Sequence, residues 1–408
     1  MLTNYVILAL CVIILLSYLF DISFKYSKIP GVAMLILMGI ALQLAVNYAG
    51  IKIPNLLPTL PILGTLGLIL IVMDAALEIK LEKNKARCLA RGIISAVVLL
   101  IVFVFVLTLV IVKVWDQPVT DALLNAIPLG IISSAVAIPS AVLLDRSQRE
   151  FITFESSVSD IIGILAFDFI LLSEESIGIK LVSFGLSGLI TIIIAAVMTA
   201  ILAIMLHKIQ YHVSYIIILT SVILVYALSK LIHLPGLFLV VVFGLALANN
   251  RLVENTFVNR FVHFEKFRED INSFKKILTE LTFLVRSFFF IMFGFYTSLA
   301  GFINISNLLL ATGITAAIFI SRWLFFLLLM GNDTGKLVWF APRGLITILL
   351  FISIPEYHRM ELINDEVVTL VILMSIFVMM LGNMISRRRK DLPTPANKEP
   401  SIEGQINN

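Results

Sequence analysis

Residues 155–165 read Glu155-Ser-Ser-Val-Ser-Asp160-Ile-Ile-Gly-Ile-Leu165, which places a carboxylate inside an apolar run long enough to cross a membrane. An ionised side chain at the centre of a bilayer costs at least about 2.5 kcal/mol on insertion scales, so acids there are rare and mark ion or proton pathways. The alternative is that Asp160 only makes a structural contact between two helices. The rest of the chain favours the first interpretation.

The composition is that of an integral membrane protein. Of the 408 residues, 60% are hydrophobic and 14% are charged, and the mean hydropathy is +1.05. A soluble domain carries about 25% charged residues. Apolar runs of about 20 residues, each able to cross about 30 Å of hydrocarbon, recur along the chain. We therefore predict an all-α polytopic membrane protein with about 13 transmembrane helices, at residues 4–20, 30–49, 60–79, 88–114, 120–144, 150–172, 180–206, 213–231, 235–249, 277–299, 306–329, 337–354 and 365–385.

The basic residues predict how the chain is oriented. With the N-terminus outside, the connections and tail on the cytoplasmic side hold 22 of the 30 Lys and Arg residues, the opposite side holds 5, and 3 lie within spans. Cytoplasmic loops carry the excess of Lys and Arg, so this distribution predicts an outside N-terminus and a cytoplasmic C-terminus. Run 4–20 lacks a basic n-region and a cleavage site, so we expect it to stay as a helix. We expect the protein in a bacterial inner membrane, in contact with lipids.

Several classes of function are disfavoured. Two cysteines and five scattered histidines form no disulfide framework and no metal-ligand spacing. The sequence has no glycine-rich phosphate loop and no soluble domain, so ATP-driven transport is disfavoured. These observations predict a secondary transporter rather than an enzyme, with no cofactor and no nucleic-acid partner.

Two predicted spans contain a helix breaker at a comparable place. The fifth includes Ser133-Ser-Ala-Val-Ala-Ile-Pro139, and the twelfth includes Ala341-Pro342-Arg343-Gly344. Proline removes a backbone donor and frees a carbonyl. A single membrane proline is often only a kink, but paired interruptions in corresponding spans of two halves indicate an inverted-repeat transporter with its site at the crossing. Arg343 brings a positive charge to this crossing, where it can offset the partial negative charge of a half-helix end.

The charged residues near the crossing fall into two groups. Glu155 lies roughly 8 Å deep in its span and Arg322 roughly 10 Å deep in another, so we expect an ion pair between them. Asp160 lies roughly 15 Å deep, near the midplane. Glu155 points about 140° away from Asp160 on the helix, which leaves Asp160 free to face the crossing. Ser156 lies one turn before Asp160 on nearly the same face, and Ser159 is adjacent to it.

Four other charged residues to consider lie within the predicted spans. Asp74 and Glu78 lie one turn apart near the cytoplasmic end of their span. They either reach water there or, in the case of Glu78, contact the ion path. Asp168 lies near the outer end of its span, and Arg286 lies deep in the tenth span without an identifiable partner.

At this point the sequence resembles a known family. The Glu-Ser start at residue 155, the polar-Asp pair at 159–160, the intramembrane Arg322 and the later Pro-Arg-Gly are similar to the monovalent cation:proton antiporters. The similarity is to the NhaP/NHE-type sodium/proton antiporters, and it covers nearly the whole chain. Further matching segments are Phe288-Phe-Phe-Ile-Met-Phe-Gly294, Leu-Val-Tyr226-Ala-Leu-Ser and Pro235-Gly236.

The resemblance implies a homodimer whose protomers each combine an interface domain with a mobile transport core. It implies an interface domain in residues 1–80 and 213–300, and a core in residues 81–172 and 301–386. A linker helix would occupy residues 173–212, and a basic, disordered tail residues 387–408.

The resemblance also implies roles for single residues. Asp160 would bind Na⁺ and a proton in turn, Ser156 and unwound backbone near Ala137 would add oxygen ligands, and Glu155 with Arg322 would form a structural pair. Two positions depart from the family pattern. The usual Asn-Asp or Asp-Asp pair is Ser159-Asp160 here, and the usual Thr-Asp-Pro is Ala137-Ile138-Pro139. The missing acid and hydroxyl leave fewer ligands.

We therefore expect exchange of cytoplasmic Na⁺ for external H⁺ by alternating access. K⁺/H⁺ exchange stays open, as does transport of Li⁺, because the sparse ligands do not choose between monovalent cations. A channel or membrane sensor on the same fold is the alternative from another class. A channel favours a continuous polar lining, whereas the polar groups here gather at one level.

Overall fold

A computed structural model describes most of the membrane-embedded part of the chain. The described residues are 11–20, 22–23, 29–50, 60–79, 86–141, 144–171, 186, 188–195, 197–198, 214–231, 234, 236–249, 264–297, 299–329 and 335–388. Much of the predicted first span, most of the predicted linker helix 173–212 and nearly all of the predicted tail 387–408 lie outside the described residues.

Every regular element in the described residues is a helix. The α-helices are α2 (Gly31–Ala49), α3 (Leu60–Glu78), α4 (Ala86–Trp115), α5 (Val119–Gly130), α6 (Ser134–Ser140), α7 (Arg146–Leu171), α9 (Ser214–Leu231), α10 (Gly236–Ala248), α11 (Phe264–Tyr296), α12 (Leu299–Ile303), α13 (Ile305–Leu329), α14 (Leu345–Ile352) and α15 (Asp365–Arg388). Two 3₁₀ helices, η7 (Leu337–Trp339) and η8 (Glu356–His358), flank α14. The prediction of an all-α fold is confirmed.

The helices have the length and the surface of a membrane protein. Among the described residues, 6 helices are long and apolar enough to cross a bilayer, with α5 and α6 taken as one. Large apolar side chains point outward on several of them, for example Phe105 at 61% exposed and Leu309 at 68%. A soluble protein rarely exposes contiguous apolar surface on this scale, whereas lipid covers it in a membrane. The protein is therefore an integral, multi-pass membrane protein, and the total of about 13 spans stays a prediction.

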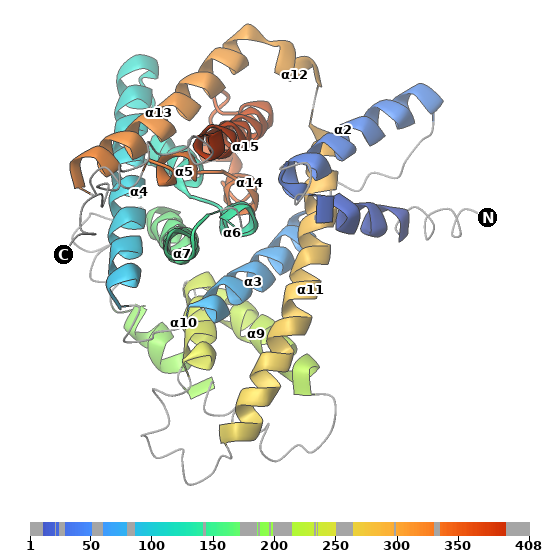
Figure 1. The fold of residues 1–408 in the computed structure, drawn as a ribbon, viewed down its shortest axis with the longest axis vertical. Helices are drawn as coiled ribbons and strands as arrows, with labels where there is room; N and C mark the ends of the chain where they lie inside the picture. Colours follow the sequence, from blue (N-terminus) through green and yellow to red (C-terminus); the bar gives the residue numbers. More distant parts are fainter. Residues whose placement is uncertain are drawn as a thin grey trace, which may run out of the picture.

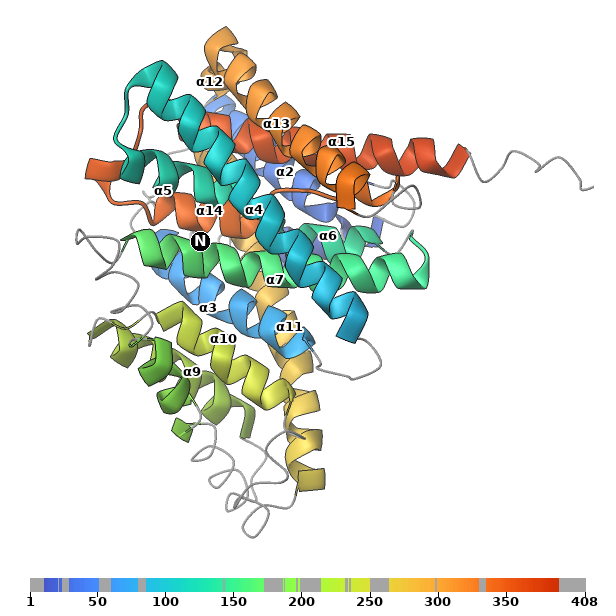
Figure 2. The ribbon, with the colours of Figure 1, turned by 90° about the vertical axis from the view of Figure 1, so that its left-hand side faces the viewer.

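The helices pack in two groups, which Figure 1 shows around a central α6 and α7. The first group consists of α2, α3, α9, α10 and α11, which pack mainly on one another. The second consists of α4 to α7 with α13, α14 and α15. The groups meet where α7 contacts α3 and α10, and Figure 2 shows α7 between α4 and α3.

Within the first group, α2 and α11 cross closely at two glycines. A Cβ on Gly39 would overlap the carbonyl oxygen of Ile291, and a Cβ on Gly294 would overlap that of Ile36. Small residues let membrane helices approach until their backbones touch. Van der Waals packing then stabilises the pair, because the hydrophobic effect does not drive helices together within lipid. Beyond this crossing, α11 is longer than its predicted span 277–299, because it already begins at Phe264.

In the second group, two helices are interrupted, as predicted. The first interruption lies at residues 131–133, between α5 and α6, and the second at residues 340–344, between η7 and α14. The prediction of unwound backbone near Ala137 was wrong. Ala137 lies within α6, and its N–H donates to the carbonyl of Ser133 at 2.9 Å. The break comes six residues before Pro139, because the two interrupted helices bond to each other there.

Candidate functional site

The two interruptions meet at one point in the interior. The N–H of Ser133 donates to the carbonyl of Pro342 at 2.9 Å, so one interruption satisfies a backbone group of the other. Gly344 permits this approach, since a Cβ there would lie 2.5 Å from Oγ of Ser133. Unwound backbone at membrane depth is tolerated only where protein or water-filled space satisfies it. At the crossing, each interruption therefore helps to satisfy the backbone of the other.

Asp160 points at this crossing from the middle of α7. Its side chain is 1% exposed. Oδ2 accepts a hydrogen bond from the N–H of Ser134, the first residue of α6, at 3.2 Å. Oδ1 is buried and has no hydrogen-bond partner among the described residues. A buried carboxylate oxygen without a donor is costly, so it is suited to a proton or a metal cation.

The other residues predicted for the site, Ser159, Ser156 and Ala137, differ in whether they face the first interruption. Oγ of Ser159 faces the first interruption, where it accepts the N–H of Ile132 at 3.0 Å. Oγ of Ser156 donates to the carbonyl of Ile152 within α7 at 2.7 Å, and its lone pairs stay available. Ala137 contributes no unwound carbonyl. The unwound backbone next to Asp160 is instead residues 131–133, and the side-chain oxygens that contact it or the start of α6 belong to Ser159 and Asp160.

Arg343 lies at the same crossing and binds backbone carbonyls. Its Nε donates to the carbonyl of Leu129, in the last turn of α5, at 2.6 Å, and its Nη1 donates to Ala341 at 3.2 Å. The N–H of Arg343 donates to Oγ of Ser375 on α15 at 2.9 Å. The carboxyl end of a helix carries a partial negative charge, which a guanidinium stabilises. Arg343 thus caps one half-helix and is oriented by α15.

Glu155 and Arg322 form a bidentate ion pair away from the Asp160 carboxylate. Nη1 and Nη2 of Arg322 lie 2.8 and 2.7 Å from the two carboxylate oxygens of Glu155. Both side chains are no more than 1% exposed. Oγ of Ser95 on α4 donates to Glu155, and Nε of Arg322 donates to the carbonyl of Leu337 at 3.0 Å. The pair therefore joins α4, α7, α13 and η7.

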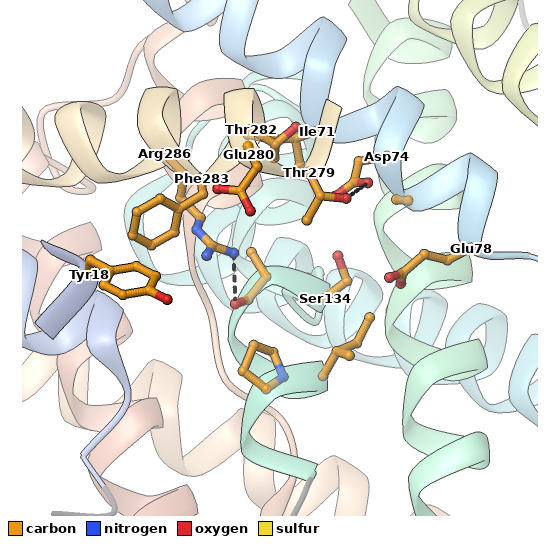
Figure 3. A pocket seen from close by; sticks show the side chains of 14 residues that line it. Tyr18, Ile71, Asp74, Glu78, Ser134, Thr279, Glu280, Thr282, Phe283 and Arg286 are labelled. Carbon is orange, nitrogen blue, oxygen red and sulfur yellow. Dashed lines mark hydrogen bonds between the residues drawn. The ribbon is translucent and has the colours of Figure 1, made fainter. Parts of the chain in front are cut away.

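A cavity of about 300 Å³ lies between α3, α6 and α11 (Figure 3). Glu78 and Asp74 line it from α3, and Ser134, which binds Asp160, lines it from α6. Oγ1 of Thr279 on α11 donates to Asp74 at 3.0 Å. Figure 3 shows the side chain of Glu78 pointing into the same space as Ser134. Glu78 thus lines the same cavity as Ser134, whose N–H bonds Asp160, and Asp74 is held against the cavity wall by Thr279.

A second cavity, of about 240 Å³, lies further along the contact between the two helix groups. Asp168 on α7 lines it together with Tyr226 and Lys230 on α9. On α3 this cavity is lined by Gly64, Thr65 and Leu68, whereas the first begins at Ile71, about one turn away. The two cavities share no lining residue.

Sequence reasoning missed three serines that organise the site, which are Ser95, Ser134 and Ser375. Ser134 had a usable signal, because a Ser-Ser pair at 133–134 precedes the predicted breaker. Ser95 and Ser375 are single serines in apolar helices, and their bonds to Glu155 and Arg343 come from helices distant in sequence. No local pattern marks such partners.

Comparisons with known proteins agree with this fold. The sodium proton antiporter MjNhaP1 from Methanocaldococcus jannaschii, in its structure at pH 8, is similar to this chain with a TM-score of 0.65 and 19% identity, covering 96% of this chain and 98% of that chain. An electron-microscopy structure of the same antiporter gives a TM-score of 0.63 and 20% identity, covering 95% and 96%. No curated protein matches the sequence.

At these identities the structural likeness establishes the fold alone. The sequence itself matches the family described as sodium/hydrogen exchanger, transmembrane, over residues 11–387, which is nearly its whole length. The chain therefore belongs to the sodium/hydrogen exchanger family.

Proposed function

We propose that this protein exchanges a monovalent cation, Na⁺ in the first place, for H⁺, and that Asp160 binds the two in turn. The observation that carries the proposal is the Oδ1 atom of Asp160, which is buried and has no hydrogen-bond partner among the described residues. A proton on Asp160 or a cation beside it removes the cost of that charge. One carboxylate cannot hold both ligands, so binding of one displaces the other.

Coupling follows from the cost of moving a charge through the protein. Occupied by a proton or by Na⁺, the Asp160 site is neutral and can pass between the two sides. Empty, it carries a charge whose transfer across hydrocarbon is unfavourable. We propose that α4 to α7 with α13 to α15 form the moving core, and that α2, α3 and α9 to α11 form the stationary interface domain of a homodimer. The separate packing of the two groups supports this division.

We further propose that the structure shows the conformation open to the cytoplasm. The 300 Å³ cavity is lined by Glu78 and by Ser134, which bonds Asp160. Both residues lie in the half of their predicted span that faces the side predicted to be cytoplasmic. The acids of the cavity would attract cytoplasmic cations. Asp168 and Lys230 would then line the external side.

The ligands support a hard monovalent cation without choosing its identity. Asp160, Ser156 and Ser159 offer oxygen atoms, which suit Na⁺, K⁺ or Li⁺ better than a soft metal. K⁺/H⁺ exchange is therefore the second candidate. A channel is disfavoured by the two cavities, which have no common lining residue and are separated by about one turn of α3.

The test is transport by purified protein in proteoliposomes. Asp160→Asn keeps the shape and removes the titrating charge, so we expect a folded protein without cation-driven proton flux for Na⁺, K⁺ or Li⁺. Asp365→Asn is the matched control, because Asp365 is exposed at the start of α15 and should leave the flux unchanged. Normal flux in Asp160→Asn would refute the assignment, and the cation series in the unmodified protein would identify the substrate.

A further inference from the structure

Pro139 deprives one carbonyl of α6 of its helical partner. Proline has no N–H, so the carbonyl four residues earlier in a helix loses its usual donor. In α6 that carbonyl belongs to Ala135, since Pro139 lies within the helix at its sixth position. A buried carbonyl needs another donor, because leaving it unpaired costs about 1–3 kcal/mol.

Arg286 of α11 supplies that donor. Its Nη1 lies 3.4 Å from the carbonyl oxygen of Ala135, as the dashed line in Figure 3 marks. The guanidinium also stacks over Phe283 of its own helix, with 5.7 Å between Cζ and the ring centroid. Stacking on an aromatic ring holds the guanidinium in place. The contact therefore runs from one helix group to the other.

This contact lies directly beside the Asp160 site. Ala135 follows Ser134, whose N–H donates to Oδ2 of Asp160 at 3.2 Å. Arg286, Ala135 and Ser134 line the same 300 Å³ cavity. If the core moves past α11 during exchange, the bond from Arg286 to Ala135 is lost in the other conformation. A contact that forms in just one of two conformations stabilises that conformation by the free energy of the contact.

We propose that Arg286 is a positioning residue that binds the carbonyl freed by Pro139 and thereby favours the conformation in which the 300 Å³ cavity extends to Ser134, next to Asp160. The inference rests on the proposed alternating movement of the core. At 3.4 Å the bond is longer than the usual N–H···O range of about 2.7–3.2 Å, so it is weak. A weak bond suits the role, because it has to break in every transport cycle.

The test follows the two cavities with reporter cysteines. Cys11 and Cys88 are the native cysteines of the chain and are first replaced by serine. Thr282→Cys then reports on the first cavity, where Thr282 is a lining residue, and Ser353→Cys reports on the second. The rate of modification by a hydrophilic maleimide is measured on purified protein without transported cation. The measurement does not need exchange, so its outcome is independent of the role of Asp160.

Two variants test the contact from its two sides, one by removing the donor and one by giving the carbonyl a helical donor. Arg286→Met keeps the side-chain stem and removes the donor, and Pro139→Ala restores a helical N–H that pairs with Ala135. We expect each to slow modification of Thr282→Cys and to accelerate that of Ser353→Cys by at least about fivefold, the usual lower range of conformational coupling. Lys276→Gln, an exposed change on the same α11, should alter neither rate.

The Arg286→Met/Pro139→Ala double variant shows whether the two single changes act through the same hydrogen bond or independently. If the bond is the cause, Arg286→Met adds nothing once Pro139→Ala has satisfied the carbonyl. Multiplying effects in the double variant would overturn the proposal, and so would unchanged rates in both single variants. Pro139→Ala also removes a helix breaker, so it is expected to fold even if Arg286→Met does not.

Discussion

The ion pair between Glu155 and Arg322 gives a quantitative prediction about stability. Both side chains are no more than 1% exposed, so water cannot replace a lost partner. Arg322→Met leaves Glu155 with only its bond from Ser95, and we expect a loss near 5 kcal/mol, the upper part of the range for a broken buried pair of about 3–5 kcal/mol. Glu155→Gln keeps one acceptor for Arg322, so we expect a loss near the lower limit, about 3 kcal/mol.

Combining the two changes removes both charges together. The Glu155→Gln/Arg322→Met variant should therefore lose less than the sum of the single losses, by about 0.5–3 kcal/mol. The assay is denaturant-induced unfolding in detergent micelles, followed by the fluorescence of the 3 tryptophans. Ser95→Ala serves as a milder member of the series, with an expected loss of about 1.5–3 kcal/mol for a hydrogen bond to a charged group. Strict additivity of the two main changes would refute a direct pair.

Three further predictions concern the crossing and the transport cycle. Gly344→Ala should reduce transport and lower the free energy of unfolding by about 1–3 kcal/mol, because the new Cβ would lie 2.5 Å from Oγ of Ser133. Flux assays and thermal unfolding measure the two effects. Gly313→Ala, in a helix with open space around the new methyl group, should instead be neutral or stabilise by about 0.4–1 kcal/mol. Arg343→Lys should lower transport as an Arg343→Gln variant does, since a lysine cannot reproduce the guanidinium that binds the carbonyls of Leu129 and Ala341, and full activity of the lysine variant would contradict this. Exchange should be electroneutral, because a single carboxylate serves both ions, and a robust exchange current under voltage clamp would rule this out.

Much of the fold could be predicted from hydropathy and charge alone. Lipid requires long apolar helices, so spans such as 88–114 and 306–329 agree with α4 and α13 within a few residues. The interruption at Pro342 to Gly344 was placed correctly because proline and glycine lie at the break itself. The first interruption was misplaced, since Pro139 weakens α6 without ending it.

The reason is that tertiary contacts decide where the first interruption lies. At residues 131–133 the backbone bonds to Ser159 and Pro342 rather than to its own helix. Sequence periodicity cannot show a bond to a segment about 200 residues away. The same limit applies to the bond of Arg286 to Ala135, because its acceptor is a backbone carbonyl on another helix.

The buried charges were easier to predict, because lipid leaves them few options. A glutamate and an arginine at matching depth in different spans have to pair or reach water, and Glu155 and Arg322 lie 2.7 Å apart at their closest. Ser95, which bonds Glu155, and Ser375, which accepts the backbone N–H of Arg343, are single serines that fit lipid-facing or buried positions, so their roles become visible only in three dimensions.

The central claim, that cation and proton compete for one carboxylate, is tested most directly by proton release on cation binding. Purified protein in weakly buffered solution is titrated with Na⁺ while the released protons are measured. The account predicts release of up to about one proton per bound cation, an apparent affinity for Na⁺ that weakens as the pH falls, and no release from Asp160→Asn. Undiminished proton release from Asp160→Asn, or an affinity for Na⁺ that is independent of pH, would contradict it.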